Sequence, residues 1–405
     1  MGLGDKSWLK RKTYPIMKKA FLLLSAAVLC LCACQPTNVE ENNKDNELSG
    51  EKVDVEGLPH GAKKLFVLNE GGMGSNNATL DFLRVSGGEY ITGAFKKMNP
   101  EEGAGLGDVG NDIAINGNEV WIVVNNSGIV EVISAQDETQ IAAIAVPTPR
   151  NIAFDSKYAY VTSWAGAYAA YGSDYKVDPE NSRNPKGQVY RIDLKTKKVD
   201  GSVEVGYQPE GIAYADGKLF VANSGGISSQ LPPSYAYDNT VSVIDCSKFK
   251  VERTAEVAPN LKNVFASTDG RIYVTTLGNY YDVHSGLYYL DDNKVYKVAD
   301  YVSVAAICAD VVFCIGAENE FDWNAPKEYF AWTCKAGRQT FHNFKLEDVA
   351  TPYGLFVTGA DDFEGAVLVA DAGDYWNPGK VHYYYGGEQK WAVTAGVCPG
   401  HFAIW

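Results

Sequence analysis

Short apolar runs alternate with turn residues along most of the chain, and the same order of runs recurs. Each copy has an apolar run, a tight turn, a second apolar run, a long loop, a third run, an Asp-rich turn and a more polar fourth run. The clearest copies begin at Asn111, Asn151 and Gly211. Runs of this length, bounded by Gly, Asn and Asp, are typical of β-strands. The pattern therefore predicts repeated units of four strands.

The copies have the spacing of propeller blades. Steps of 39, 60, 52, 40, 51 and 47 residues separate the positions just before each first run, which are Asn111, Arg150, Glu210, Lys262, Val302, Tyr353 and Gly400. Blades of four strands recur at about 40 to 50 residues, and such a unit cannot bury its apolar face alone. We call these seven positions the ring positions.

The two ends of the folded region complement each other. The chain closes with one apolar run, His401 to Trp405, whereas the region that opens at Lys64 has three runs and lacks a first one. A terminal strand that pairs with the opening three would leave no exposed sheet edge. We therefore predict an all-β, seven-bladed β-propeller over residues 63–405, closed by the C-terminal strand. Two packed β-sandwiches, the alternative, leave the spacing and the orphan runs unexplained.

The first 33 residues read as a signal peptide. Lys18 and Lys19 precede the apolar stretch 20–31, which is too short to span a membrane. Residues 31–34 are Leu-Cys-Ala-Cys, which resembles a bacterial lipobox. By that resemblance Cys34 would carry a lipid. We also expect Met17 to be the true start. The alternative is a plain secretory signal with incidental cysteines.

Residues 34–62 are polar and acidic and are expected to form a disordered tether. Their acidic run resembles the surface-export signal of Bacteroidota lipoproteins, which would place the protein on the outer membrane at the cell surface.

Charge excludes some partners. The chain has 36 basic and 50 acidic residues, and loss of residues 1–33 would change its net charge from −14 to −19. Such a field repels nucleic acid and anionic bilayers. Five cysteines lie beyond the signal region, with no zinc-like spacing, and are expected to be free thiols.

The long loops all follow second strands, so one face of the propeller would carry them. Three share a pattern of aromatic residues beside amides or carboxylates: 278–282 (GNYYD), 320–324 (EFDWN) and 373–377 (GDYWN). Such groups suit a large, flat ligand with amides or hydroxyls. The predicted ligand-binding residues are Asn111, Arg150, Trp164, Tyr171, Glu210, Tyr237, Tyr280, Tyr281, Trp323, Tyr353, Tyr375 and Trp376. Side-chain-stabilised turns with aromatic plugs, and ring residues that bind only water, are the alternatives.

Catalytic signatures are weak. Residues 105–110 match the dinucleotide pattern G-x-G-x-x-G, but they lead into a predicted strand rather than a helix. A metal-dependent lactonase would need carboxylates and amides at the axis, where Glu210, Asn111 and Asp112 could contribute, but Arg150 and Lys262 would oppose a cation. We therefore expect no enzyme activity, no cofactor and no metal.

Several phrases resemble a known family. They are LNEGGMGSNNATLDFL (68–83), GLGDVGNDIAI (105–115), VGYQPEGI (205–212) and YDNTVSVID (237–245). Over residues 64–405 the chain resembles the YncE-like seven-bladed propellers, and in particular the corrinoid-capturing Bacteroidota surface lipoproteins of the BtuG type. That resemblance implies a lipid-anchored protein that binds cobalamin or related corrinoids and passes them to a TonB-dependent outer-membrane transporter. A glycan or host-matrix adhesin and a lactonase-like hydrolase are the alternatives.

Overall fold

The computed structural model describes residues 48, 50–101, 103, 105–165, 185–226, 231, 233–292, 294–322, 324–359 and 362–405. The signal peptide 1–33, Cys34 and residues 35–47 lie outside this part of the chain and remain predictions.

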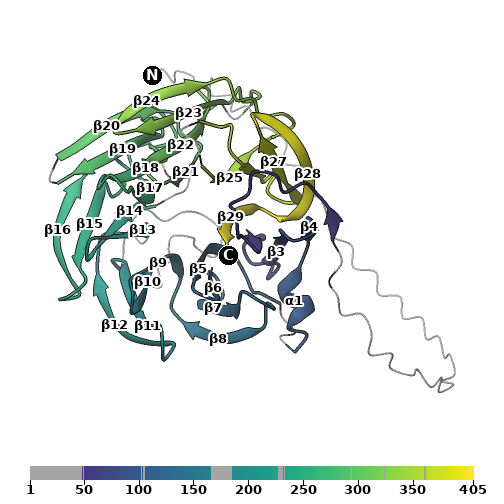
Figure 1. Ribbon diagram of the computed structural model, residues 1–405. Coiled ribbons are helices and arrows are strands. Elements are labelled where there is room, and N and C mark those ends of the chain that lie inside the picture. Colours follow the sequence, from purple (N-terminus) through teal and green to yellow (C-terminus); the bar gives the residue numbers. More distant parts are fainter. Residues whose placement is uncertain are drawn as a thin grey trace, which may run out of the picture. The chain divides into compact units, whose positions relative to one another are not determined.

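Seven antiparallel sheets surround a central axis and form a seven-bladed β-propeller, as predicted (Figure 1). The first blade contains β1 (Glu51–Lys52), β2 (Lys64–Asn69), β3 (Thr79–Arg84), β4 (Glu89–Ile91) and the C-terminal β29 (Pro399–Ile404). From the axis outward, the second blade contains β5 (Gly110–Asn116), β6 (Glu119–Val124), β7 (Ile129–Ser134) and β8 (Gln140–Ala145). The third blade contains β9 (Pro149–Phe154), β10 (Tyr158–Ser163), β11 (Gln188–Asp193) and β12 (Lys198–Glu204). The fourth blade contains β13 (Pro209–Ala215), β14 (Lys218–Asn223), β15 (Thr240–Asp245) and β16 (Lys250–Glu256).

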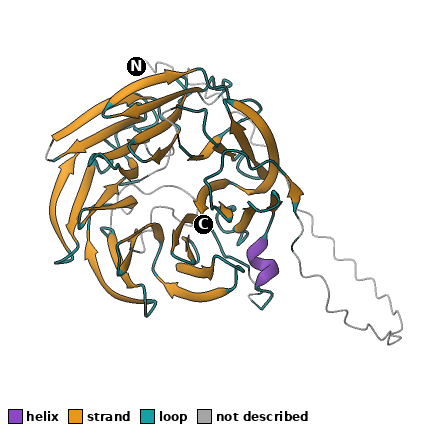
Figure 2. Cartoon of the chain, viewed as in Figure 1, coloured by secondary structure: helices purple, strands orange, loops and turns teal. Residues whose placement is uncertain are grey.

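The last three blades repeat this order. The fifth blade contains β17 (Leu261–Ala266), β18 (Ile272–Thr276), β19 (Gly286–Asp291) and β20 (Lys294–Asp300). The sixth blade contains β21 (Val304–Cys308), β22 (Val311–Gly316), β23 (Phe330–Lys335) and β24 (Arg338–His342). The seventh blade contains β25 (Pro352–Val357), β26 (Val367–Asp371), β27 (Pro378–Tyr385) and β28 (Glu388–Val397). Figure 2 shows how completely strands dominate the described part of the chain, in which α1 (Ala94–Met98) is the one helix. None of the described helical structure is long and apolar enough to cross a membrane.

The ring closes as the sequence predicted. Strand β29 pairs antiparallel with β2, so that Leu65 faces Ile404 and Phe66 faces Ala403. In Figure 1 the yellow β29 lies inside the purple strands of the first blade. Closure supplies the first blade with its innermost strand and joins the two ends of the folded region.

The tether expected over residues 34–62 is shorter than predicted. Strand β1 pairs with β4 at the outer edge of the first blade, and Val53, Val55 and Leu58 pack against the apolar cluster between the first and seventh blades. The indole nitrogen of Trp391 donates a hydrogen bond to the carbonyl of Asp54 at 2.8 Å. Alternating apolar residues in an otherwise acidic segment supply enough buried surface to order it.

Apolar side chains between adjacent blades form the core. Trp121 of the second blade is fully buried and lies edge-on against Phe154 of the third, with ring centroids 5.6 Å apart. This blade-to-blade packing fixes the inner strands relative to one another. The cysteines expected as free thiols are free: Cys246, Cys308, Cys314, Cys334 and Cys398.

Candidate functional site

Six of the seven ring positions stand at β-bulges of the innermost strands. The pairing register shifts at six places, which are Asn111 in β5, Arg150 in β9, Glu210 in β13, Lys262 in β17, Tyr353 in β25 and Gly400 in β29. A bulge interrupts the strict alternation of side chains and can aim one toward a site. The repeat found in the sequence therefore marks the positions at which the backbone presents side chains to the axis.

Proline contributes to this geometry. Strands β9, β13, β25 and β29 each begin with Pro, directly before the ring position. Proline lacks a backbone donor and is tolerated at the first residue of a strand. The remaining ring position, Val302, precedes β21, and Gly400 offers no side chain.

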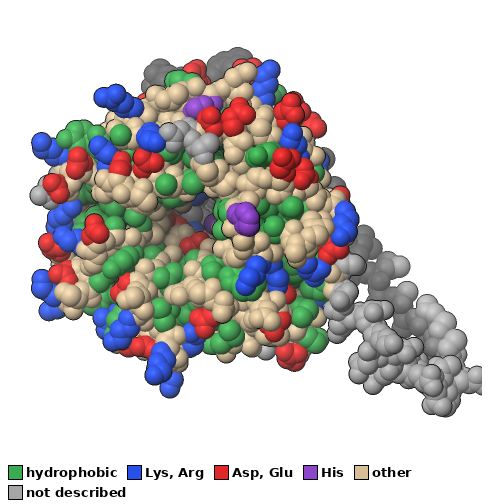
Figure 3. Space-filling model, in the orientation of Figure 1, with side chains coloured by type: hydrophobic (Ala, Val, Ile, Leu, Met, Phe, Trp, Pro, Cys, Tyr) green, Lys and Arg blue, Asp and Glu red, His purple; other side chains and the backbone are tan. Residues whose placement is uncertain are grey.

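The ring positions open into a cavity of about 630 Å³, within the usual range of about 300 to 1,000 Å³ for small-molecule sites. In the space-filling view the molecule is hollowed near the centre of the ring (Figure 3). Aromatic lining residues are Trp164, Tyr280, Phe321, Tyr329, Tyr353 and Tyr375, and charged or titratable ones are Glu70, Arg150, Glu210, Lys262, Glu320, Lys327 and His401. Every blade contributes. A second cavity of about 330 Å³ shares Asn151, Lys262, Asn263, Tyr353 and His401 with the first, so both belong to one axial channel.

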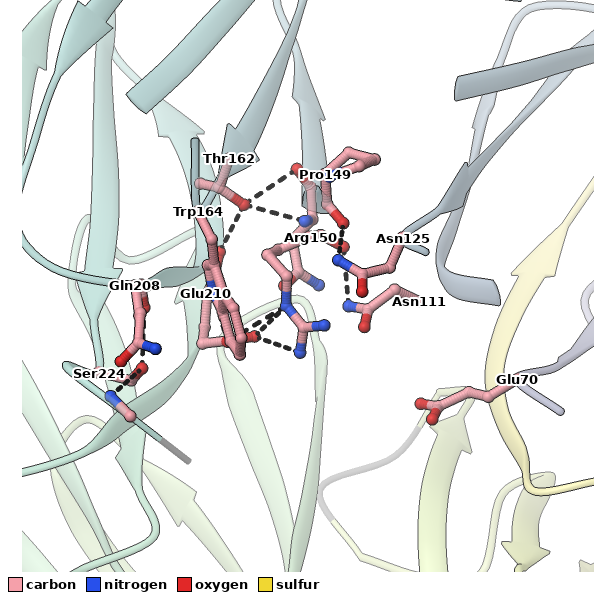
Figure 4. A network of polar contacts seen from close by, with 12 residues as sticks. Glu70, Asn111, Asn125, Pro149, Arg150, Thr162, Trp164, Gln208, Glu210 and Ser224 are labelled. Carbon is pink, nitrogen blue, oxygen red and sulfur yellow. Dashed lines mark hydrogen bonds and ion pairs between the residues drawn. The ribbon is translucent and has the colours of Figure 1, made fainter. Parts of the chain in front are cut away.

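On one side of the cavity, Arg150 and Glu210 form a buried ion pair (Figure 4). Nε of Arg150 lies 3.0 Å from Oε2 and 3.2 Å from Oε1 of Glu210, and Nη2 lies 3.0 Å from Oε2. The indole nitrogen of Trp164 donates to Oε1 at 3.0 Å, and the guanidinium lies 4.6 Å from the Trp164 ring centroid. Burial raises the pKa of Glu210, and the guanidinium of Arg150 opposes that rise. We call Arg150, Glu210 and Trp164 the paired wall.

Side chains of neighbouring strands hold the backbone of this wall. Asn111 donates from Nδ2 to the carbonyl of Arg150 at 2.8 Å, and Thr162 donates from Oγ1 to the carbonyl of Glu210 at 2.7 Å. Figure 4 shows both contacts. The amide of Asn111 therefore has a structural partner.

The opposite side of the cavity combines residues of the first, fifth and seventh blades. Glu70 accepts a hydrogen bond from the hydroxyl of Tyr353 at 2.8 Å, and its other oxygen lies 2.9 Å from Nε2 of His401. Nζ of Lys262 lies 5.8 Å from the Tyr353 ring centroid. Burial lowers the pKa of Lys262, and burial next to Glu70 raises the pKa of Tyr353. We call Glu70, Tyr353, His401 and Lys262 the open wall.

Two aromatic loops share one backbone design. In 278–282 and 373–377, an Asn or Asp side chain accepts backbone hydrogen bonds: Asn279 from residues 281 to 283, and Asp374 from residues 376 and 377. Tyr280 and Tyr375 have φ values of 63° and 67°, a left-handed conformation that non-glycine residues seldom adopt. Both loops are thus side-chain-stabilised turns, the alternative weighed for them, and each also sends its first aromatic residue to the cavity.

The second aromatic residue of each pair lies elsewhere. Tyr281 is 43% exposed and donates from its hydroxyl to the carbonyl of Leu231 at 2.7 Å, and Trp376 is 84% exposed. Neither lines the cavity. In each turn the residue with the left-handed conformation, Tyr280 or Tyr375, is the one that lines the cavity.

The predicted ligand-binding residues therefore divide into three groups. Those that line the cavity are Asn111, Arg150, Trp164, Glu210, Tyr280, Tyr353 and Tyr375. Tyr237 does not: it is buried against Tyr235, with ring centroids 4.9 Å apart, beside a different hollow of the fourth blade. Tyr281 and Trp376 face outward, and Tyr171 and Trp323 lie outside the described residues.

The predicted list omitted several lining residues. Glu320 accepts hydrogen bonds from the backbone nitrogen of Ser285 at 3.0 Å and lies 2.9 Å from Nδ1 of His284. The His284 ring stacks on Phe321 at 5.4 Å. Glu320 and Phe321 begin a loop from which only Trp323 was predicted to bind the ligand. Glu70 directly follows β2, just as Trp164 directly follows β10.

The carboxylate and amide groups considered for a lactonase are used within the protein. Glu210 is bound to Arg150, and Asp112 accepts hydrogen bonds from the backbone nitrogens of Ile113 and Ile152, both at 2.9 Å. In the described ranges, no group of three or more His, Cys, Asp or Glu side chains is arranged to hold a metal ion.

Fold and cavity together define a seven-bladed β-propeller with a binding or scaffold role. The chain belongs to the family described as a domain of unknown function, DUF5074, whose model matches residues 63–364. A comparison with curated proteins finds no match.

Two solved structures are similar in part. Kuenenia stuttgartiensis hydrazine synthase has 16% identity and a TM-score of 0.48, over 68% of this chain and 76% of that chain. The Neurospora crassa Pan2 WD40 domain has 12% identity and a TM-score of 0.44, over 72% of this chain and 79% of that chain.

Proposed function

We propose that this protein is a non-enzymatic, lipid-anchored binding protein of the cell surface that captures a corrinoid such as cobalamin in its axial cavity. A TonB-dependent outer-membrane transporter would be its partner. The observation that carries the proposal is the cavity of about 630 Å³, which six aromatic side chains line together with several charged groups.

A corrin is a broad, flat ring with amides around its edge. Its faces would pack on aromatic side chains such as Tyr280 and Tyr375, and its amides would bond with groups such as Glu320 or Glu70. Aromatic contacts of this kind contribute about 0.5 to 1.5 kcal/mol beyond the area they bury. The net charge of −19 predicted for the mature chain disfavours nucleic acid as the ligand.

The test is calorimetric titration with cobalamin of the parent, Tyr375→Ala and Trp376→Ala. The two residues are neighbours in one turn, but only Tyr375 lines the cavity. We expect Tyr375→Ala to weaken binding about tenfold and Trp376→Ala to change it by less than about twofold. Absence of cobalamin binding by the parent would refute the proposal. Equal effects of both changes would mean that the ligand binds outside the cavity.

A glycan or host-matrix adhesin is the second candidate. The observation that favours it is the exposure of Trp376 and Tyr281 on the rim, since exposed aromatic side chains gathered on one face mark interaction surfaces. For this function the result reverses: Trp376→Ala would abolish binding to a glycan array that the parent recognises, and Tyr375→Ala would retain it.

A further inference from the structure

Lys262 differs from the other charged side chains of the cavity in its lack of a protein partner. Arg150 is paired with Glu210, and Glu70 bonds with Tyr353. Within the described ranges, Nζ of Lys262 takes part in no hydrogen bond or ion pair, and it lies 5.8 Å from the Tyr353 ring centroid. Its three donors face the channel unused.

The remaining charged groups of the cavity are also satisfied. Glu320 accepts from the backbone nitrogen of Ser285, and Lys327 donates to three carbonyls of its own loop. Nε2 of His401 lies 2.9 Å from Glu70. Among the charged groups of this cavity, Lys262 is thus the one that has no hydrogen-bond or ion-pair partner in the described part of the chain.

A β-bulge places Asn263 beside it. In β17 the register passes from Leu261 opposite Thr276 to Val264 opposite Val274, so residues 262 and 263 share the bulge. Successive residues of a regular strand point to opposite faces, but both of these line both cavities of the channel. The backbone nitrogen of Asn263 donates to Oγ1 of Thr275 at 3.0 Å, while its side-chain amide has no partner among the described residues.

We propose that Lys262 and Asn263 form a subsite for an anionic oxygen group, a carboxylate or a phosphate, on a ligand whose ring system packs against the aromatic side chains of the cavity. This inference rests on the proposed capture of a ligand, and it adds the charge that the ligand carries. The ammonium of Lys262 and the NH₂ group of Asn263 can both donate hydrogen bonds to an anionic oxygen. Hydrogen bonds assisted by a charge are about twice as strong as neutral ones.

Glu70, Glu210 and Arg150 act on Lys262 electrostatically. Both carboxylates have partners of their own, and neither comes within ion-pair distance of the ammonium. Water can hydrate the ammonium in the channel of the free protein, and a ligand oxygen would replace it.

The experiment compares three small aromatic probes, phenyl phosphate, benzoate and neutral phenol, by NMR titration of the protein. We expect the parent to bind phenyl phosphate or benzoate at least about tenfold more tightly than phenol, and the stronger of the two identifies the anion. Lys262→Met should abolish that preference, Lys262→Arg should retain most of it, and Asn263→Ala should reduce it. Lys195→Met removes one positive charge from an exposed turn on the other face and should leave the preference unchanged.

Equal binding of phenol and both anions by the parent would overturn the proposal. So would an anion preference that survives in Lys262→Met. Melting curves of each variant identify any that fail to fold. If Lys262→Met does not fold, Asn263→Ala carries the test, because it keeps the charge and should still reduce the preference; an unchanged preference in that variant would overturn the proposal.

Titration with cobalamin, which has a phosphodiester, and cobinamide, which lacks it, separates this inference from the proposed function. If neither corrinoid binds but phenyl phosphate or benzoate binding depends on Lys262, corrinoid capture fails and the anion subsite stands. If cobalamin binds while the anion preference is absent or independent of Lys262, corrinoid capture stands and the subsite fails.

Discussion

On the paired wall, the carboxylate of Glu210 meets a guanidinium and an indole nitrogen within 3.2 Å. On the open wall, the carboxylate of Glu70 meets only a phenol and an imidazole, and the ammonium of Lys262 has no described partner. Both walls belong to one cavity, and each takes two residues from equivalent bulges of the inner strands: Arg150 and Glu210 on one wall, Lys262 and Tyr353 on the other. The blade design therefore sets where the side chains go, and the residue types set whether they satisfy one another.

The presence or absence of a partner determines what each buried charge costs the folded protein. A buried ion pair is costly to break, because removal of one partner leaves a desolvated charge behind. A buried charge without a partner carries that cost in the free protein and recovers it when a ligand supplies the partner. The paired wall is thus a rigid support, and the open wall holds the groups that can still bind.

The largest expected effect is that of Glu210→Gln. This change keeps the shape of the side chain but leaves the buried guanidinium of Arg150 without its anion, so we expect a loss of about 3 kcal/mol in the free energy of unfolding. Urea denaturation at pH 7 measures it. The double change Arg150→Met with Glu210→Leu should cost less than the single one, and a single loss below about 1 kcal/mol would show that the pair is not a support.

Glu70→Gln is the matched change on the open wall. The amide oxygen of Gln can still accept from Tyr353, and among the described residues no Lys or Arg lies within ion-pair distance of Glu70. We expect a loss of about 1 kcal/mol in the same denaturation experiment. A loss equal to that of Glu210→Gln would mean that the two walls do not differ in kind.

The sequence predicted the blades and the ring positions well because both depend on local pattern. Turn residues and apolar runs recur in each unit, and a repeat that must bury its faces against its neighbours tolerates few departures from that order. The same reasoning failed for residues 51–62, where acidic composition hid Val53, Val55 and Leu58. Composition averages over a segment, whereas packing depends on which positions are apolar.

The choice between adjacent aromatic residues was beyond sequence reasoning. Tyr375 and Trp376 are both large aromatic residues, and it is the folded turn, in which Tyr375 has a left-handed backbone, that places Tyr375 and not Trp376 at the cavity. Glu70 was missed for a different reason: its partners Tyr353 and His401 lie about 280 and 330 positions away and meet it only when the ring closes. Polar networks between distant blades leave no local signal in the chain.

The smallest expected effect tests the open wall without any ligand. Burial lowers the pKa of Lys262 in the folded protein, whereas the unfolded chain keeps the ordinary value of 10.5. Between these two values the unfolded state binds more protons, so this lysine makes the protein less stable at pH 7 and the deficit disappears as the pH rises toward 10.5. Lys262→Met should therefore raise the melting temperature at pH 7 by about 1 to 2 °C, and its advantage over the parent should shrink with increasing pH. Lys195→Met, an exposed control, should show no such trend. A lower melting temperature for Lys262→Met at pH 7 would mean that the ammonium already has a stabilising partner in the free protein, and the open wall would then resemble the paired one.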